Sequence, residues 1–321
     1  MLNKAIFIRI LQITIALGLI TLIFSQIDKH AIVDLLSHAN LSYLLLAFLL
    51  LILQITVAAY RWLIIIRLAG FSPPVLDCIR SFGMSSFVNA MVPGGITGDI
   101  TRIWVTARSG IPSNIATYTV LSDRMLTLVG LGLLITALFL SSGVPMNTVN
   151  MFALGISVIL IIAFCGLILI VHGITHFKIN IPFLLLPITS LSRVMSTLLQ
   201  YPYQLIALIG IIMAGHMMLI LSMAILAYGL QVSLPLQAIL IGLPSILLFS
   251  AVPITPGGWG LREGVMVLVL KQFHIQTEAA LSISILFGLG STLANLPVAL
   301  WWFIHKTWSP PNTYLNNGKI S

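Results

Sequence analysis

Charged side chains stand in or beside strongly apolar stretches of this sequence, where an ion needs a partner, water or a function. They are Arg61, Asp99, Arg102, Asp123, Arg124, Arg262 and Glu263. A charge at the middle of a bilayer costs at least about 2.5 kcal/mol on insertion scales. The planar fork of arginine suits a phosphate group. We therefore expect Arg102 and Arg262, with Arg61, to surround an anionic phosphate, while the carboxylates orient these arginines or bear a proton.

The same residues could instead have a structural role. They would then form ion pairs, or lie at the membrane interface with their aliphatic stems in lipid. We prefer it for Arg67 and Arg108. Asp99 and Arg102 are spaced i, i+3, so they can pair on one helical face. Arg262 and Glu263 are adjacent, and we expect their side chains to point in different directions.

Two glycine-rich motifs lead to two of the arginines. Pro93–Gly98 (PGGITG) precedes Arg102, and Pro256–Gly260 (PGGWG) precedes Arg262. A helix broken in lipid leaves backbone groups unpaired, so such breaks persist only inside protein or beside water. The N–H groups freed at a helix start can hold an anion, and glycine permits close approach. If the motifs are not plain loops, the candidate substrate-binding site also includes Gly94, Gly95, Gly257 and Gly258.

The composition requires a membrane. Hydrophobic residues make up 59% of the chain and charged residues only 7%, against about 25% charged residues in a soluble domain. A net charge of +8 would suggest nucleic acid in a soluble protein. In a membrane protein Lys and Arg instead gather in cytoplasmic loops, so we expect no nucleic-acid partner.

No motif for nucleotide, hydrolase or zinc-protease chemistry occurs in the sequence. Cys78 and Cys165 lie in apolar segments and share no metal-like spacing. His172 and His176 are spaced i, i+4, but no carboxylate or cysteine is near them in sequence. We therefore expect no metal and no cofactor.

The hydrophobic pattern predicts an all-α, polytopic transmembrane helix bundle. Six stretches are long enough to span a bilayer, at about residues 10–27, 41–66, 113–140, 151–171, 205–230 and 279–303. Two shorter apolar stretches, 75–92 and 236–252, end at the glycine-rich motifs, and shorter arms follow them. We expect one transmembrane domain over residues 1–307 and a disordered tail over 308–321.

A span–hairpin–span unit occurs twice, at about 41–140 and 205–303. With a cytoplasmic N-terminus and re-entrant hairpins, only three of the 15 Lys and Arg residues, Lys29, Arg262 and Lys271, fall toward the outside. Both termini are then cytoplasmic and the repeat is inverted, a pattern that points to a transporter binding site. If 236–252 crosses the bilayer fully, the C-terminus moves outside.

At these motifs the chain resembles the lysylphosphatidylglycerol synthase transmembrane region family, flippase-like membrane proteins of bacteria and archaea. Order and spacing match over about residues 10–305. The resemblance is carried by Arg61-Trp62, Asn89–Arg102 (NAMVPGGITGDITR), Ser122–Arg124, Ala227–Val232 and Pro253–Gly264 (PITPGGWGLREG). Residues 286–299 depart from the family pattern, because they lack the tyrosine-arginine pair often seen there.

The resemblance implies a multi-pass protein of the bacterial or archaeal cell membrane that moves a lipid between leaflets. An anionic phospholipid, an aminoacyl-phospholipid or a polyprenyl-phosphate lipid would fit. In bifunctional relatives a separate cytoplasmic domain aminoacylates phosphatidylglycerol. This sequence has no such domain, so we expect translocation without that transfer, with membrane lipids and a separate lipid-modifying synthase as partners.

The alternative is a membrane-embedded enzyme or accessory protein of glycolipid or cell-envelope lipid biosynthesis. Arginines closed into ion pairs with the carboxylates would favour a structural role for these residues. An open cavity between the two motifs would favour translocation.

Overall fold

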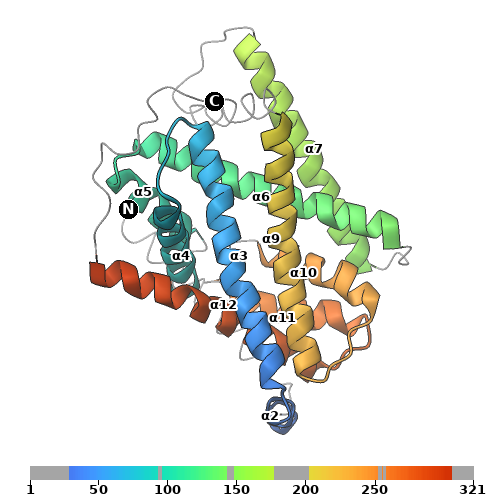
Figure 1. Cartoon of the computed structure of the whole chain (residues 1–321). Coiled ribbons are helices and arrows are strands. Elements are labelled where there is room, and N and C mark those ends of the chain that lie inside the picture. Colours follow the sequence, from blue (N-terminus) through green and yellow to red (C-terminus); the bar gives the residue numbers. More distant parts are fainter. Residues whose placement is uncertain are drawn as a thin grey trace, which may run out of the picture.

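The computed structural model describes residues 29–92, 96–142, 148–176, 202–251, 255 and 258–305, and all regular structure there is helical (Figure 1). This confirms the predicted all-α class. The expected first span at 10–27, nearly all of the linker between the fourth and fifth spans, and the tail at 308–321 lie outside the described residues. So do Gly94, Gly95 and Gly257.

The helices fall into two groups by length. The long ones are α3 (Leu41–Leu68), α6 (Ser113–Ser142), α7 (Thr148–His176), α9 (Pro202–Gly229) and α12 (Thr277–His305). The shorter ones are α2 (Lys29–Ser37), α4 (Val75–Met91), α5 (Thr97–Arg108), the π-helical turn η2 (Ala238–Gly242), α10 (Leu243–Ser250) and α11 (Leu261–Lys271).

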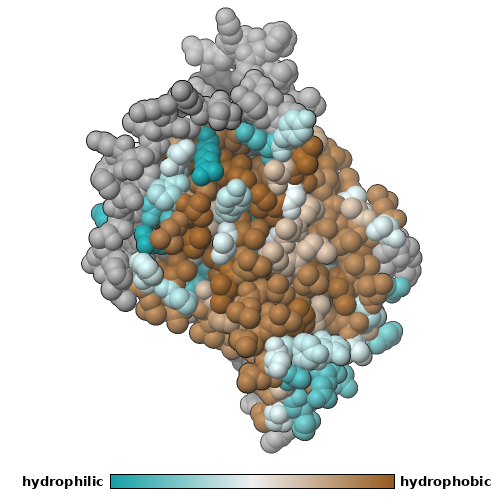
Figure 2. All heavy atoms as spheres, viewed as in Figure 1, coloured by the Kyte–Doolittle hydropathy of each residue, from teal (hydrophilic) through white to brown (hydrophobic). Residues whose placement is uncertain are grey.

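Four helices are long and apolar enough to cross a membrane: Leu41–Leu68, Ser113–Ser141, Tyr203–Gly229 and Thr277–Trp301. The spans predicted at these places are therefore confirmed, and α7 covers the one expected at 151–171. At most 39% of the most apolar stretch of each is buried within the protein. Figure 2 accordingly shows a broad hydrophobic surface over α3 and α9, which lipid rather than water must cover.

Helix α2 was not expected, because its sequence reads as a short polar stretch. It packs against α12, a tertiary contact that local sequence does not reveal. The chain then turns at Asn40, whose side-chain oxygen accepts a hydrogen bond from Ser42 N at 3.0 Å and caps α3.

Helices α3 and α9 form an antiparallel pair at the centre of the bundle (Figure 1). At one end Asn40 N donates to Gly229 O at 2.8 Å, and the rings of Tyr43 and Tyr228 meet edge to face with centroids 4.8 Å apart. At the other end Ile65, near the C-terminus of α3, packs in a cluster with residues from the first turns of α9. The two helices therefore run in opposite directions over their whole length.

The other elements pack in matching pairs on either side of α3 and α9. Helix α4 packs on α5, and α10 packs on α11. Helices α6 and α12 both pack on α3 and α9; in addition α12 packs on α4, whereas α6 packs on α10. The first arm of each hairpin, α4 or α10, thus packs on the long helix that follows the other hairpin, whereas the second arm, α5 or α11, packs on the long helix that directly follows it. The colours of Figure 1 show that α6 and α12 also run in opposite directions.

The first hairpin depends on a glycine where α5 begins. A Cβ atom at Gly98 would lie 2.5 Å from Ser85 O and 2.7 Å from Asn89 Cβ on α4, so Gly98→Ala forces the two helices apart. We expect this change to lower the free energy of unfolding by about 1–3 kcal/mol, measured as a lower melting temperature in detergent. The matched control is Gly155→Ala on α7, where nothing lies within 4 Å. Equal melting of the two variants would contradict the packing described here.

Candidate functional site

Asp123 on α6 binds two arginines from two other helices. Arg61 on α3 donates from Nε to Oδ1 at 2.7 Å and from Nη2 to Oδ2 at 3.2 Å. Arg102 on α5 donates from Nη1 to Oδ2 at 2.9 Å. These three side chains are only 2–7% exposed. One carboxylate therefore joins α3, α5 and α6. Its hydrogen bonds to both arginines offset the cost of burying their charges, which would be high if the charges were unpaired.

The guanidinium of Arg102 also lies against aromatic rings. Its Cζ atom is 5.0 Å from the ring centroid of Trp62 and 5.2 Å from that of Phe82. Cation–π attraction of this kind is strongest away from water. The rings and the carboxylate together hold Arg102 in one orientation.

The ion-pair network extends from Arg102 toward the surface through Asp99. Arg102 Nη2 lies 3.5 Å from Asp99 Oδ1, the i, i+3 pair expected from the sequence. Arg124 donates from Nε to both oxygens of Asp99 at 3.0 and 2.9 Å. The Arg124 side chain is 47% exposed, the most open of the set. Three arginines against two aspartates leave this network with one net positive charge.

A second ion pair lies at the start of α11. Arg262 Nη2 donates to Glu263 Oε1 at 2.6 Å, and Ser284 on α12 donates to the same oxygen at 3.1 Å. The expectation that Arg262 and Glu263 point apart was wrong. Glu263 folds back so that Oε2 accepts the backbone N–H of Gly260, which caps the helix. This turn places its carboxylate beside the Arg262 guanidinium.

Arg262 occupies space that Gly288 leaves free on α12. A Cβ atom at Gly288 would overlap the Arg262 guanidinium, which Glu263 and the ring of Trp259, 4.8 Å away, hold in place. We expect Gly288→Ala to displace Arg262 from Glu263 and to lower the free energy of unfolding by about 1–3 kcal/mol. Thermal melting measures this loss. Gly210→Ala on α9, with nothing within 4 Å, should melt like wild type, and a Gly288→Ala variant that does the same would contradict the placement of Arg262.

A cavity of about 360 Å³ lies between the two halves of the chain. The predicted site residues that line it are Arg61, Asp99, Arg102, Asp123, Arg124, Gly258 and Arg262. Gly258 has the positive φ of +78° that glycine accommodates without strain. Glu263 is not among the lining residues and acts on the cavity through Arg262. The candidate residues from both halves thus meet around one space, apart from Glu263 and the three glycines that lie outside the described residues.

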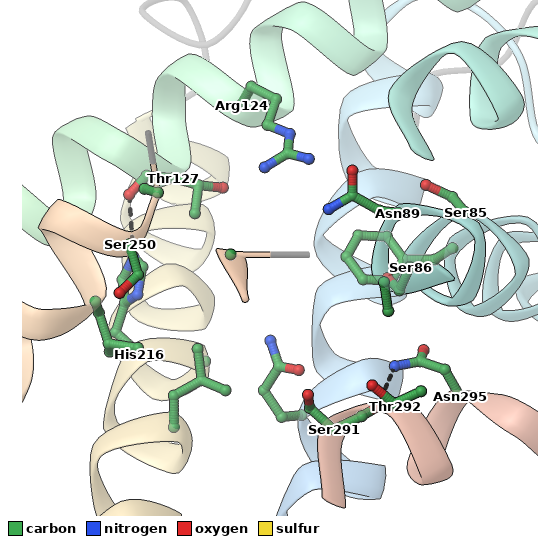
Figure 3. Close-up of a pocket in the computed structure, with 18 of the residues that line it drawn as sticks. Ser85, Ser86, Asn89, Arg124, Thr127, His216, Ser250, Ser291, Thr292 and Asn295 are labelled. Carbon is green, nitrogen blue, oxygen red and sulfur yellow. Dashed lines mark hydrogen bonds between the residues drawn. The ribbon is translucent and has the colours of Figure 1, made fainter. Parts of the chain in front are cut away.

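The sequence analysis missed an uncharged part of the lining, the amide–hydroxyl cluster. It consists of Ser86, Asn89, Ser291, Thr292 and Asn295. In Figure 3 these side chains from α4 and α12 surround the same space as Arg124, with His216, Thr127 and Ser250 across from them. His216 Nε2 lies 3.0 Å from Thr127 O. Small and polar residues spaced i, i+3 and i, i+4 along apolar helices are the signal that would have indicated this cluster.

An all-helical chain whose long helices expose apolar side chains is an integral membrane protein. It belongs to the Lysylphosphatidylglycerol synthase TM region family, whose profile matches residues 9–299. The resemblance found in the sequence is thereby confirmed, and the family indicates a role in lipid-related processes. The UPF0104 membrane protein MJ1595 of Methanocaldococcus jannaschii is 24% identical over an alignment length of 315 residues, and the match covers 87% of this chain and 88% of that protein.

Proposed function

We propose that this protein moves a phosphate-bearing lipid between the leaflets of the cell membrane. The headgroup passes through the cavity while the acyl chains stay in the bilayer. The observation that carries the proposal is a cavity lined by arginines from both halves of the chain, Arg61, Arg102 and Arg124 from one and Arg262 from the other. A bundle with an apolar outer surface has no evident use for such a space unless a polar group enters it.

An inverted repeat would supply the movement. In this proposal α3 to α6 and α9 to α12 are two copies of one unit, related by a pseudo-two-fold axis in the membrane plane. The antiparallel α3 and α9 and the reciprocal packing of α12 on α4 and α6 on α10 support it. Rocking of one half against the other around a central site is the mechanism such repeats use.

The two hairpins are proposed to be re-entrant, entering the bilayer from opposite sides. Helix α4 has 17 residues, and η2 with α10 covers Ala238–Ser250. Both are shorter than the roughly 20 residues that a full crossing needs. Their returning arms, α5 with 12 residues and α11 with 11, are shorter still.

The ion pairs prepare the arginines for an anion. Asp123 and Glu263 fix the guanidinium groups of Arg102 and Arg262 at the cavity wall, so little side-chain entropy is lost when a phosphate arrives. The four lining arginines exceed Asp99, Asp123 and Glu263 by one charge, which matches the single negative charge of a phosphodiester. Closed ion pairs and a cavity thus occur together, and each contributes to binding.

The same pairing argues for transport rather than catalysis. A general base must be free to accept a proton from its substrate. Asp99, Asp123 and Glu263 are each engaged in an ion pair with at least one arginine, so none of these three carboxylates is free to act in this way. We propose that the lipid crosses unchanged, that a separate synthase modifies it, and that the N-terminus is cytoplasmic.

The test is lipid movement in proteoliposomes containing phosphatidylglycerol with a fluorescent label on one acyl chain. A membrane-impermeant reductant destroys only the label exposed in the outer leaflet. Protein-containing vesicles should lose more of the signal than protein-free vesicles, because inner-leaflet lipid is carried outward. If phosphatidylglycerol, phosphatidic acid and a polyprenyl phosphate all behave as in protein-free vesicles, the proposed function is wrong.

A further inference from the structure

A carboxylate occupies the same position in the second arm of both hairpins, and each carboxylate binds an arginine. Asp99 is the third residue of α5, and Glu263 is the third residue of α11. Asp99 binds Arg124, which is the twelfth residue of α6. Glu263 binds Arg262, which belongs to α11 itself rather than to the long helix that follows. The two pairs therefore differ in the sequence position of the arginine.

The guanidinium groups of the two pairs nevertheless occupy corresponding places. The twelfth residue of α12, the counterpart of Arg124 on α6, is Gly288. A Cβ atom at Gly288 would overlap Arg262, and the three atoms that it would meet first all belong to that guanidinium. Arg262 thus fills the space over α12 in which a side chain at position 288 would lie. In each half a guanidinium stands between the second arm of the hairpin and the long helix that follows it.

Uncharged residues of the cavity wall follow the same correspondence between the halves. The fourteenth residues of α3 and α9 are Gln54 and Gly215, and both line the cavity. The fifteenth residues of α6 and α12 are Thr127 and Ser291, and both line it as well. Equal positions in the two halves therefore face the same space, which supports the treatment of the two arginines as counterparts.

Packing explains why the arginine lies on different helices in the two halves. The second residue of α5 is Gly98, where a Cβ atom would lie 2.5 Å from Ser85 O on α4. The first half has no room for a side chain at this position, so its arginine comes from α6. The second residue of α11 is Arg262, and α12 instead has the glycine, Gly288. Each half thus combines one arginine with one glycine in exchanged positions.

Both arginines keep donors that a phosphate can use. Arg124 binds Asp99 through Nε, and no described residue forms a hydrogen bond with its Nη1 or Nη2. In Figure 3 this guanidinium points into the cavity. Arg262 binds Glu263 and Ser284 through Nε and Nη2, and its Nη1 has no hydrogen-bond partner within the described part of the chain.

The two pairs differ in how open they are. The Arg124 side chain is 47% exposed, whereas the Arg262 side chain is 8% exposed. The ring centroids of Trp259 and Phe287 lie 4.8 and 5.9 Å from the Arg262 Cζ atom. Because Trp259 belongs to the second hairpin, a displacement of this hairpin would uncover Arg262. The structure thus has the pair of the first half open and the pair of the second half covered.

We propose, building on the function proposed above, that Arg262 binds the lipid phosphate in the second half as Arg124 binds it in the first. The two arginines are the phosphate contacts at the two ends of the path, and one is covered while the other is open. Arginine suits both places because its fork binds two phosphate oxygens at once. Asp99 and Glu263 position the guanidinium groups and do not contact the anion.

Moving the arginine from α11 to α12 tests this assignment. The measurement is translocation of acyl-labelled phosphatidylglycerol in proteoliposomes, and the melting temperature shows whether each variant is folded. Arg262→Gly should slow translocation about ten- to a hundredfold, the usual effect of a hydrogen bond to a charged group. Arg262→Gly combined with Gly288→Arg copies the arrangement of the first half, so it should transport at least about tenfold faster than Arg262→Gly alone. Arg262→Gly combined with Gly288→Gln fills the same space without a charge and should stay slow.

Two results of this experiment would overturn the inference. One is a folded Arg262→Gly/Gly288→Arg variant that transports no faster than Arg262→Gly. The other is equal recovery with glutamine at position 288, which would show that Arg262 serves packing rather than phosphate binding.

A milder substitution covers the case in which the double variant does not fold. Arg262→Lys keeps the charge and the ion pair but loses the fork, so it should slow translocation about tenfold, the effect of one hydrogen bond. Arg124→Lys should slow it by a similar factor. Transport by Arg262→Lys at the wild-type rate would overturn the inference and leave the proposed function standing. If the wild-type protein itself moves no lipid, the proposed function is wrong as well.

Discussion

Asp123→Asn is expected to lower the free energy of unfolding by about 3–5 kcal/mol, the usual cost of removing one partner from a buried ion pair. Asp123 is 3% exposed and neutralises Arg61 and Arg102 together. Without the negative charge of Asp123, both guanidinium groups stay buried and lose most of the opposite charge that stabilises them. Because α3, α5 and α6 meet at this carboxylate, all three contacts weaken at once. The expected readout is loss of monodisperse protein on heating in detergent.

The matched control for Asp123→Asn is the same exchange at Asp34. The Asp34 side chain is 75% exposed and pairs with His38, the residue after the end of α2, and exposed pairs contribute little stability. The loss of stability in Arg61→Gln should lie between those of Asp123→Asn and Asp34→Asn, because Asp123 then keeps its hydrogen bond to Arg102. If Asp123→Asn melts like Asp34→Asn, the buried network does not hold the bundle together.

Arg124→Ala is expected to slow translocation of an anionic lipid about ten- to a hundredfold while the protein stays folded. A hydrogen bond to a charged group contributes about 1.5–3 kcal/mol, and about 1.4 kcal/mol is a factor of ten. Arg124 lines the cavity and is 47% exposed, so its removal strands no buried charge. Asp99 keeps its contact with Arg102. Arg124→Ala should therefore lower the translocation rate in proteoliposomes and leave the melting temperature unchanged.

Arg108→Ala controls for the loss of a positive charge near the site. Arg108 ends α5, is exposed and lies 4.3 Å over the ring of Trp104, but it does not line the cavity. It should transport like wild type. Equal slowing by both substitutions would show that general surface charge, rather than a contact at the cavity, governs the rate.

The sequence predicts the long helices well because each one must match the bilayer. The stretches at 41–66, 113–140, 205–230 and 279–303 all became helices that meet the requirements of a span. Composition and hydrophobic length are sufficient for such elements, since lipid replaces tertiary burial as the partner of most apolar side chains. Helix α2 was missed for the opposite reason, because its partner is α12 rather than lipid.

The charged part of the site was also accessible from the sequence, whereas its geometry was not. An ionised residue in an apolar segment is conspicuous, and Arg61, Asp123 and Arg262 were all selected for that reason. Asn295 and Ser291 are not conspicuous, because single uncharged polar residues are common in membrane helices. Their importance depends on which face of α12 meets α4. Similarly, only the cap at Gly260 explains why Glu263 turns toward Arg262.

The most direct test of a route through the cavity is to fill it. Ser291 lines the cavity, whereas Leu293, two residues further along α12, is 52% exposed on the outer surface. The measurement is the translocation rate of acyl-labelled phosphatidylglycerol in proteoliposomes containing Ser291→Trp or Leu293→Trp. If the headgroup passes between the two halves, Ser291→Trp stops movement and Leu293→Trp keeps the wild-type rate. If the two variants transport equally well, the lipid does not cross through this cavity.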